Sequence, residues 1–418
     1  MRPEFGKLLI HCVGLLAVGA CGVQETADGP VSPPFTRYDS AGVEVIINAR
    51  PSRWVDDQGW HVGSVPLLRI GSRQGEPAYE FSDIAGAISL PEGGVAVADA
   101  GSGEVRFFDG TGRLERIVGR SGRGPGEFTA LSGLGIGLDG RLWAYDFALR
   151  RISWIDPHNG SIGSSTLGPE PPVLTSVGAL PAGMFVLRQL WGASAVASAD
   201  RIGIRRDSAV VAVFDSAGTL IDTIGAFPGR EVIISLEAGR GVMTRRPFGA
   251  DLAVVTRDSL VVVGEQDQPR FDEYSAAGEL RRRVILPRGD NGALGASDIE
   301  DFLEARLREV PAADRPAVRS DLESLPFPES RPAYGRLLVD LAGNVWVGEW
   351  TAEGKTERRW SVVDSRGVWL GDVVLPEGLR LLSVATDHLI GVERDELDVE
   401  SVAVYAIEPG HQVSKPAS

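Results

Sequence analysis

Short stretches in which apolar residues alternate with small or polar ones recur along most of the chain. This period of two is typical of β-strands with one buried face. Six stretches share the same form, in which a turn precedes about six residues of alternating pattern: 94–99, 141–146, 184–189, 260–265, 344–349 and 388–393. Their recurrence predicts a protein built from repeated β-sheet modules.

A second pattern predicts a hairpin tip after most of these strands. In Phe108-Asp109-Gly110-Thr111-Gly112 the turn begins with Asp and ends with Gly. An Asp side chain at the first turn position accepts hydrogen bonds from backbone amides, and Gly tolerates the positive φ that follows. Related tips occur at 155–160, 214–218, 274–278 and 363–367, whereas a further copy at 38–42 has no place in the repeat.

The two ends of the repeated region complement each other. Residues 67–71 resemble the last strand of a module, as at 114–119, and the stretch 379–407 provides three strands without a fourth. We therefore expect the N-terminal strand to complete the last sheet and to close a ring of six sheets within residues 37–410. Radial closure leaves only short, protected strand edges, so the predicted fold is an all-β, six-bladed β-propeller.

Two segments connect this pattern to a known family. Residues 97–99 (Val-Ala-Asp) followed by 105–109 (Val-Arg-Phe-Phe-Asp) resemble an NHL repeat, and the loop 122–128 resembles the blade-joining loop of bacterial six-bladed propeller lipoproteins. The likeness is close in the first two blades and weakest in the third, where 188–191 (Arg-Gln-Leu-Trp) replaces the usual acidic turn. The resemblance implies a binding scaffold, because most such propellers bind rather than catalyse.

Residues 297–325 break the β pattern. Ser297-Asp298-Ile299-Glu300 has the spacing of a helix capping box, and apolar residues follow at helical intervals. The pattern predicts a helix over 298–310 and a second short helix near 316–325. We expect the apolar side of this insertion to rest on one end of the ring, and a lid over the central pocket or a partner surface is the alternative.

The start of the chain has the layout of an export signal. Arg2 and Lys7 precede a mostly apolar run that is too short to span a bilayer. The run Val18-Gly19-Ala20-Cys21 resembles the lipobox of bacterial lipoproteins. This resemblance implies a signal peptide at 1–20 and an acylated Cys21 that anchors the protein to a membrane, whereas an ordinary secretory signal or an uncleaved start is the alternative.

Further expectations follow for the segments around the propeller. Gly22 after the acylated cysteine suits sorting to the outer membrane, by resemblance to known lipoproteins, so we expect the protein in the periplasm or at the cell surface. Residues 21–36 are rich in small and polar residues and read as a flexible tether, and 411–418 reads as a tail. Cys12 would leave with the signal peptide, and the mature chain would then have no disulfide and no thiolate nucleophile.

The formal net charge of the chain is −15. A nucleic-acid partner would need a concentrated basic surface, so this acidity argues against one. A protein or a carbohydrate remains possible as the partner of the exported domain.

The sixth residue of each repeated strand is the candidate site. These residues would lie at equivalent heights around one axis, and they are Asp99, Asp146, Gln189, Glu265, Glu349 and Glu393. Five converging carboxylates would favour a divalent cation in the channel. In the alternative interpretation each acid ends its strand and holds the next turn. Trp191 and Trp350 lie close to the ends of their strands and are the best candidates to face a pocket.

The functional prediction is a lipid-anchored binding or scaffolding module of the cell envelope, with no catalytic residue assigned. A metal-dependent hydrolase or lyase, similar to lactonases or amidating lyases, is the alternative. The histidines outside the leader (His61, His158, His388 and His411) stand alone in the sequence, and the last three are expected at the surface. They argue against a histidine-built metal site but leave an oxygen-only site open.

Overall fold

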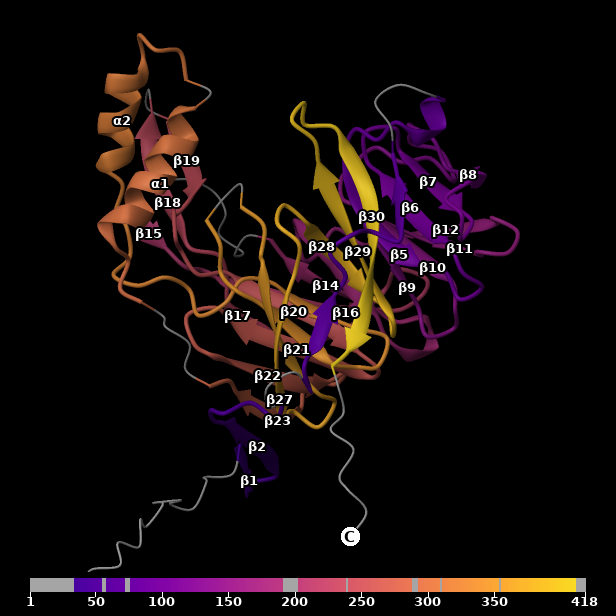
Figure 1. Cartoon of the computed structure of the whole chain (residues 1–418), viewed down its shortest axis with the longest axis horizontal. Helices are drawn as coiled ribbons and strands as arrows, with labels where there is room; N and C mark the ends of the chain where they lie inside the picture. The colour runs from indigo at the N-terminus through magenta and orange to yellow at the C-terminus, as the bar shows by residue number, and fades with distance from the viewer. Residues whose placement is uncertain are drawn as a thin grey trace, which may run out of the picture. The chain divides into compact units, whose positions relative to one another are not determined.

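The computed structural model describes residues 34–54, 58–71, 76–190, 202–237, 240–287, 292–308, 310–352 and 355–410. Within these residues six sheets form a ring (Figure 1), and each contains four antiparallel strands ordered from the channel to the rim. The inner strand of each sheet contacts the inner strand of the next, and the last contacts the first. The predicted six-bladed, all-β propeller is therefore confirmed.

The first three blades follow one another along the chain, with short 3₁₀ turns at Pro77–Tyr79 and Pro181–Gly183. Blade 1 consists of β5 (Ile84–Ser89), β6 (Val95–Asp99), β7 (Glu104–Phe108) and β8 (Leu114–Val118). Blade 2 consists of β9 (Leu131–Ile136), β10 (Leu142–Asp146), β11 (Arg151–Ile155) and β12 (Ile162–Thr166). Blade 3 consists of β13 (Leu174–Ala179), β14 (Phe185–Gln189), β16 (Ser208–Phe214) and β17 (Leu220–Pro228).

The remaining blades complete the ring. Blade 4 contains β20 (Leu252–Arg257), β21 (Leu260–Glu265), β22 (Arg270–Ser275) and β23 (Leu280–Ile285). Blade 5 contains β24 (Leu337–Val339), β25 (Val345–Gly348), β26 (Arg359–Val363) and β27 (Trp369–Val374). Blade 6 contains β28 (Arg380–Val384), β29 (His388–Arg394) and β30 (Glu400–Pro409), and takes its further strands from the N-terminal region.

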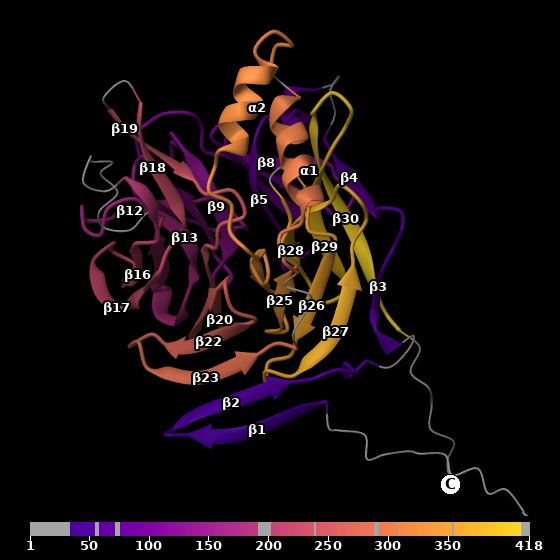
Figure 2. The same cartoon turned by 90° about the vertical axis from the view of Figure 1, so that its left-hand side faces the viewer.

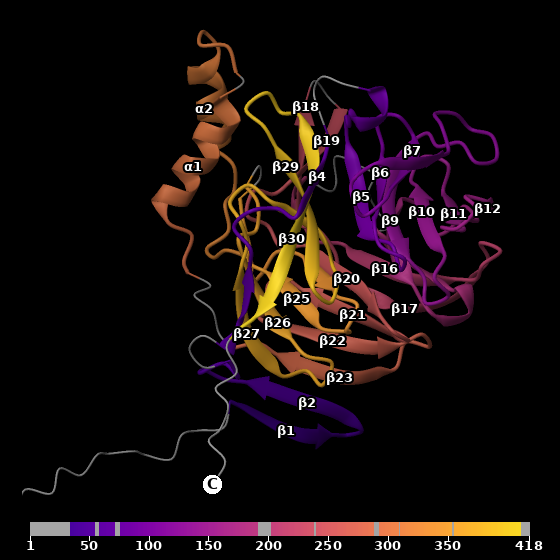
Figure 3. The same cartoon turned by 45° about the vertical axis from the view of Figure 1, so that its right-hand side comes forward.

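Two N-terminal strands close blade 6. Strand β4 (Leu68–Ile70) pairs antiparallel with β30, with Ile70 opposite Val402. Strand β3 (Trp60–Val62) pairs with the far end of β30 (Figure 3). The predicted closure of the last sheet by an N-terminal strand is therefore confirmed.

The core lies between neighbouring blades. Val105 and Phe107 of blade 1 pack against Leu131 and Leu142 of blade 2 in one buried cluster. Each large apolar side chain that leaves water in this way stabilises the fold by about 1.5–3 kcal/mol. The alternating sequence pattern therefore places one set of side chains against each adjacent sheet.

The hairpin tips have the geometry expected from their sequences. Asp109 Oδ1 accepts hydrogen bonds from the amides of Thr111 and Arg113, both at 2.9 Å, and Gly112 has a φ of 82°. A related arrangement forms the tip at 38–42, where the amide of Gly42 donates to Asp39 Oδ1 at 3.1 Å. This segment is therefore also a hairpin, although it lies outside the four-stranded repeat.

That segment is a hairpin of β1 (Phe35–Ser40) and β2 (Val43–Asn48). Strand β2 pairs parallel with β23, so the hairpin extends blade 4 at the rim of the ring (Figure 2). The sequence did not predict this placement, because a hairpin tip indicates two strands but not the sheet edge that receives them. Strand β1 begins at Phe35, which lies inside the segment 21–36 that the sequence analysis expects to be a flexible tether.

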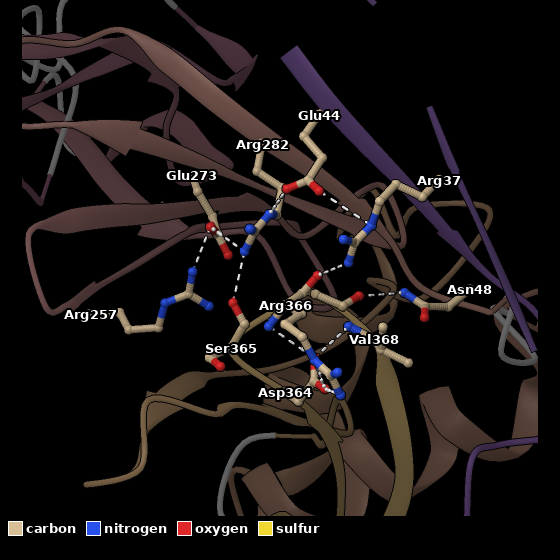
Figure 4. A network of polar contacts seen from close by, with 11 residues as sticks. Arg37, Glu44, Asn48, Arg257, Glu273, Arg282, Asp364, Ser365, Arg366 and Val368 are labelled. Atoms are coloured by element: carbon tan, nitrogen blue, oxygen red, sulfur yellow. Dashed lines mark hydrogen bonds and ion pairs between the residues drawn. The ribbon is translucent and has the colours of Figure 1, made fainter. Parts of the chain in front are cut away.

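Polar contacts fasten this hairpin to blades 4 and 5 (Figure 4). Arg282 lies 2.6 Å from Glu44 of the hairpin and 3.3 Å from the buried Glu273, which also pairs with the buried Arg257 at 2.6 Å. Burial raises the pKa of Glu273, and the two arginines oppose that shift. The side chain of Asn48 donates to the carbonyl of residue 367 and accepts from the amide of residue 369, both in blade 5.

Two insertions lie on one face of the ring. The first is a sheet of β15 (Gly203–Arg205), β18 (Val232–Glu237) and β19 (Arg240–Arg245), which the sequence did not predict. The second contains α1 (Ala296–Leu307) and α2 (Arg315–Glu323), close to the ranges predicted (Figure 2). Both β18–β19 and the helices join an outer strand to the next inner strand. We call the face where the inner strands begin the insert face, and the opposite face the turn face.

The helical insertion begins differently from the prediction. The sequence predicts a capping box that begins at Ser297. In the structure the box begins at Gly295, because the amide of Gly295 donates to Asp298 Oδ2 at 2.9 Å. The apolar side of the insertion packs on the propeller, because Phe302 joins a cluster with Phe248 and Trp350. No helix of the described residues is long and apolar enough to cross a membrane.

Candidate functional site

The predicted site residues lie at the insert-face ends of the second strands. Asp99 is fully buried; its Oδ1 accepts from the amides of Ser82 and Asp83, and its Oδ2 pairs with Arg106 at 3.2 Å. Asp146 is also fully buried and accepts from the loop amides of residues 129 and 130, at 2.6 and 3.2 Å. Both carboxylates hold the loop that leads into the inner strand of their own blade.

The later members of this set also have partners within their blades. Gln189 is buried and accepts from the amide of residue 210 at 3.0 Å, and Glu349 accepts from the amides of residues 358 and 359. Glu393 accepts from the hydroxyl of Tyr405 and pairs with Arg69. Glu265, half-buried, ends β21.

The structure gives most of these side chains the contacts expected of residues that hold a turn. Within the described residues, no three His, Cys, Asp or Glu side chains are grouped so that they could hold a metal ion. A role of the six residues in ligand binding, or of a divalent cation among them, stays a prediction.

Of the two candidate tryptophans, only Trp350 lies in the described part of the chain, and Trp191 lies outside it together with Cys21, the leader and the tail. Trp350 stacks near Phe248, with ring centroids 5.2 Å apart. Both rings line a small pocket of about 80 Å³ beneath α1, together with Arg245 and Arg306. Trp350 therefore lines a pocket formed by the insertions and not by the channel, and its role in ligand binding stays a prediction.

Basic side chains surround the pockets of the insert face. The pocket beneath α1 has three arginines, since Arg246 lines it as well. A second pocket of about 380 Å³ follows the seam between blades 4 and 5 and is lined by Arg50, Arg331 and Arg359, with Glu349 and Asp372. This concentration stands out in a chain whose formal net charge is −15.

The largest of these pockets, about 760 Å³, lies between blades 5 and 6. Its basic lining residues are Lys355, Arg358, Arg380 and Arg394, and Glu377 is its one acidic lining residue among the described residues. We call it the basic pocket. It can bind a carboxylate or phosphate through charge-assisted hydrogen bonds.

The charges of the basic pocket are only partly balanced from within. Arg380 and Arg394 share the buried Glu400, at 3.6 and 2.8 Å. The exposed Asp398 also pairs with Arg394 at 2.9 Å, and the exposed Asp301 pairs with Lys355 at 3.0 Å. Burial lowers the pKa of Arg380; Glu400 opposes that shift, and Arg336 and Arg394 add to it. A bound anion would therefore stabilise the charged form of Arg380.

A similar imbalance occurs across the channel in blade 3. Arg188 Nη1 is buried and has no hydrogen-bond partner among the residues that the structure describes, although it lies 3.7 Å from Asp251 Oδ1. Burial lowers the pKa of Arg188, Asp251 opposes the shift, and Arg230 and Arg245 add to it. Arg188 in blade 3 and Arg380 in blade 6 are therefore arginines of the insert face whose charge is only partly neutralised by nearby carboxylates.

The turn face has a different kind of cavity. It has a volume of about 470 Å³ and is lined by residues of the inner strands of all six blades. Most of the lining is apolar or small, and two exposed leucines, Leu138 and Leu341, belong to it. We call it the channel cavity.

The sequence analysis did not identify either feature. The arginines of the basic pocket are separated by up to 39 positions between Lys355 and Arg394, so no local basic run indicates them. Arg358 directly precedes β26 and Arg380 begins β28, so the two residues lie beside different strands of the repeat and the strand alignment does not bring them together.

Comparisons with known proteins add only distant likenesses. No family model matches the chain, and no curated protein sequence matches it either. Its structure is similar to that of an inferred exported protein from Bacteroides fragilis (TM-score 0.49, 11% identity, covering 88% of this chain and 100% of that one). It is also similar to streptogramin B lyase (0.41, 10%, 85% and 99%) and to the calcium-binding protein regucalcin from Agrobacterium tumefaciens (0.40, 10%, 83% and 96%). Similarity at this level carries no argument about function.

Proposed function

We propose that this protein is an exported, lipid-anchored β-propeller of the cell envelope that binds an anionic ligand at its insert face. The leader and the lipobox-like run before Cys21 support export and anchoring. The single observation that carries ligand binding is the basic pocket, where Arg380 and Arg394 share one carboxylate beside Arg358 and Lys355. The ligand carries carboxylate or phosphate groups, on a carbohydrate or on a protein.

The pocket favours such a ligand for a physical reason. The half-buried Arg380 shares its carboxylate partner, Glu400, with Arg394, so its positive charge lies in a partly desolvated site with an incomplete counter-charge, which is costly without an anion. Arginine forks also bind planar carboxylates and phosphates through two parallel hydrogen bonds. The described residues provide no comparable group of metal ligands, so the proposal does not extend to metal-dependent chemistry.

Titration calorimetry on the purified full chain tests the binding. The probes are oligogalacturonate, inorganic phosphate and, as the neutral control, maltooligosaccharide. Arg380→Gln and Arg358→Gln are each expected to weaken anion binding about tenfold, because a charge-assisted hydrogen bond contributes about 1.5–3 kcal/mol. Arg281→Gln is the matched control, since Arg281 lies on the outer strand β23 and pairs only with Glu279 among the contacts described.

The outcomes separate clearly. Binding of either anion that is weakened by both pocket substitutions and kept by Arg281→Gln supports the proposal. Equal affinity of all variants, or no affinity for either anion, contradicts it. Arg358 is exposed and its side chain is not needed for packing, so its substitution tests the pocket even if Arg380→Gln fails to fold.

The anchor is tested separately by fractionation. In a two-membrane bacterium that expresses the full chain, the wild type is expected in the washed outer-membrane fraction and Cys21→Ser in the soluble envelope fraction. A Cys21→Ser variant that stays on the membrane after washing would show that the lipid anchor is wrong.

A further inference from the structure

The channel cavity contains a hydroxyl group bound to an imidazole. Ser89 is the last residue of β5 and lines the cavity. Its Oγ lies 2.5 Å from Nε2 of His388, the first residue of β29. The bond therefore crosses the seam between blades 1 and 6, and it joins residues 299 positions apart.

The imidazole has a second partner on its other side. His388 Nδ1 lies 2.7 Å from Asp387 Oδ1. Hydroxyl, imidazole and carboxylate thus follow one another in the order found in serine hydrolases, which are recognised by geometry and not by fold or by order along the chain. The sequence analysis expected His388 to stand alone at the surface, and the structure corrects this, because the side chain is only 26% exposed and has a partner at each ring nitrogen.

The electrostatics suit this order. The hydrogen bond with His388, and the charge of its ring when that ring is protonated, hold the pKa of Asp387 below its usual value, so the carboxylate is ionised at neutral pH. An ionised carboxylate accepts the Nδ1–H of a neutral imidazole, and this tautomer leaves Nε2 free to accept the proton of Ser89.

We propose that Ser89, His388 and Asp387 form a hydrolase site that cleaves small, uncharged carboxylic esters whose acyl group enters the channel cavity. Ser89 Oγ attacks the ester carbonyl carbon while its proton passes to His388 Nε2. The bond between the carbonyl carbon and the alcohol oxygen of the ester then breaks. That oxygen takes the proton from Nε2 and leaves as the alcohol. A water molecule, deprotonated by His388, next attacks the acyl-serine, so that the carboxylic acid leaves and the Ser89 hydroxyl is restored.

The lining of the cavity defines the substrate class. Ile88, Leu382 and Val384 lie on the two inner strands nearest Ser89, and Leu341 is exposed at the cavity. Arg257 is the cationic residue of the lining within the described residues, and it pairs with Glu273. A volume of about 470 Å³ with mostly apolar walls accepts a compact acyl chain, and the two carboxylates of the lining, Asp258 and Asp340, disfavour an anionic one. The site is separate from the basic pocket and does not depend on the proposed anion binding.

A purely structural bond between blades 1 and 6 would have the same geometry. Ser383 offers a matched control, because it lines the same cavity and its hydroxyl donates to the carbonyl of Ala87 at 2.9 Å, across the same seam. If both serines only join the blades, their substitution to alanine should have similar effects.

The test uses the purified full chain in detergent. A fluorophosphonate probe, mapped by peptide mass spectrometry, should label Ser89 in the wild type and leave Ser383 unlabelled, because only an activated serine reacts. Hydrolysis of p-nitrophenyl butyrate should fall by about 100-fold or more in Ser89→Ala and His388→Gln, and by about tenfold or more in Asp387→Asn. Ser383→Ala should retain at least about half of the activity.

These outcomes decide the proposal. Labelling of Ser89 together with loss of activity in Ser89→Ala, at an unchanged thermal unfolding midpoint, supports it. An unlabelled Ser89 in the folded wild type overturns it, as does a Ser89→Ala variant that hydrolyses the ester as fast as Ser383→Ala. Labelling is read on the wild type, so a variant that fails to fold does not obscure the result.

Discussion

At the insert face, strand ends and the loops beside them place arginines around pockets whose charge is only partly balanced, as at Arg380, which begins β28, and Arg394, which ends β29. At the turn face, short hairpin turns join the strands within each blade. The cavity between the inner strands there is lined mostly by small and apolar residues. Both regions are built on the same strands. The difference shows that the repeat fixes the ring, whereas the loops that interrupt the repeat determine what each end can bind.

The largest expected effect concerns the acids at the strand ends. Asp99→Ala removes one of the two carboxylate partners of Arg106, whose side chain is 5% exposed and which keeps Glu104 at 2.9 Å, and it frees two loop amides. We expect a loss of about 3–5 kcal/mol in the free energy of unfolding, because several hydrogen bonds to a buried carboxylate are lost together. Equilibrium urea denaturation measures it.

Glu349→Ala is the matched control on the same face. Glu349 is exposed and accepts from two backbone amides, so its loss should cost only about 0.5–1.5 kcal/mol. If instead Asp99→Ala unfolds at the wild-type urea concentration while anion binding is lost, the acids serve a ligand and not the turns.

The next effect tests whether the insertions serve only one face. Phe248 is 7% exposed and contacts Phe302 of α1, Phe327 and Trp350. Phe248→Ala should cost about 3 kcal/mol, because it leaves a cavity beneath the helices. Hydrogen exchange in α1 should become faster, while exchange in the inner strands near Ser89 should not change.

Leu236→Ala is the control for this substitution, since Leu236 lies in β18 of the other insertion and is 46% exposed. Its effect should stay within about 0.5 kcal/mol. Faster exchange throughout the ring in Phe248→Ala would mean that the insertions support both faces.

A third effect concerns the turn face and depends on the proposed hydrolysis. Leu341 is 64% exposed and lines the channel cavity, whereas Leu397 is 61% exposed in the loop between β29 and β30 on the insert face. Leu341→Asp should raise the KM for p-nitrophenyl butyrate about tenfold with kcat retained, because the lost apolar contact is worth about 1.4 kcal/mol.

Leu397→Asp should leave both constants unchanged. The pair differs only in the face that it occupies, so steady-state kinetics on the two variants locates the ester. Equal KM values for the two would place the substrate outside the channel cavity.

The fold could be predicted because its information is local and repeated. The alternation of apolar with small or polar residues indicates the second strand of each blade. Asp109 and Gly112 indicate a hairpin tip, because the contacts that form the tip join residues at most four positions apart. The docking of β2 on β23 could not be predicted, since it depends on Glu44 meeting Arg282 across 238 positions. Ser89 and His388 were missed for the same reason, because two isolated polar residues become neighbours only when the ring closes.

The candidate acids show a different limit of the sequence. Their equivalent positions were read correctly, since Asp99, Asp146 and Gln189 all end the second strand of their blade. The sequence could not tell whether a side chain at that position points to the channel or back to its own loop. In the structure, backbone amides hold these side chains, from loops at Asp99 and Asp146 and from strand β16 at Gln189, and no residue pattern reveals such partners.

The smallest expected effect separates the two faces by salt. Raising the ionic strength from about 10 mM to about 150 mM shortens the Debye length from about 30 Å to about 8 Å. Binding of oligogalacturonate should weaken about fivefold, because the exposed arginines attract the anion through solvent. Hydrolysis of the uncharged butyrate ester should change less than about twofold, since Ser89 and His388 act on a neutral group within the cavity. Calorimetry and steady-state kinetics on one preparation give both numbers. A parallel decline of the two would contradict the separation, because it would mean that charge at the insert face governs access to both sites.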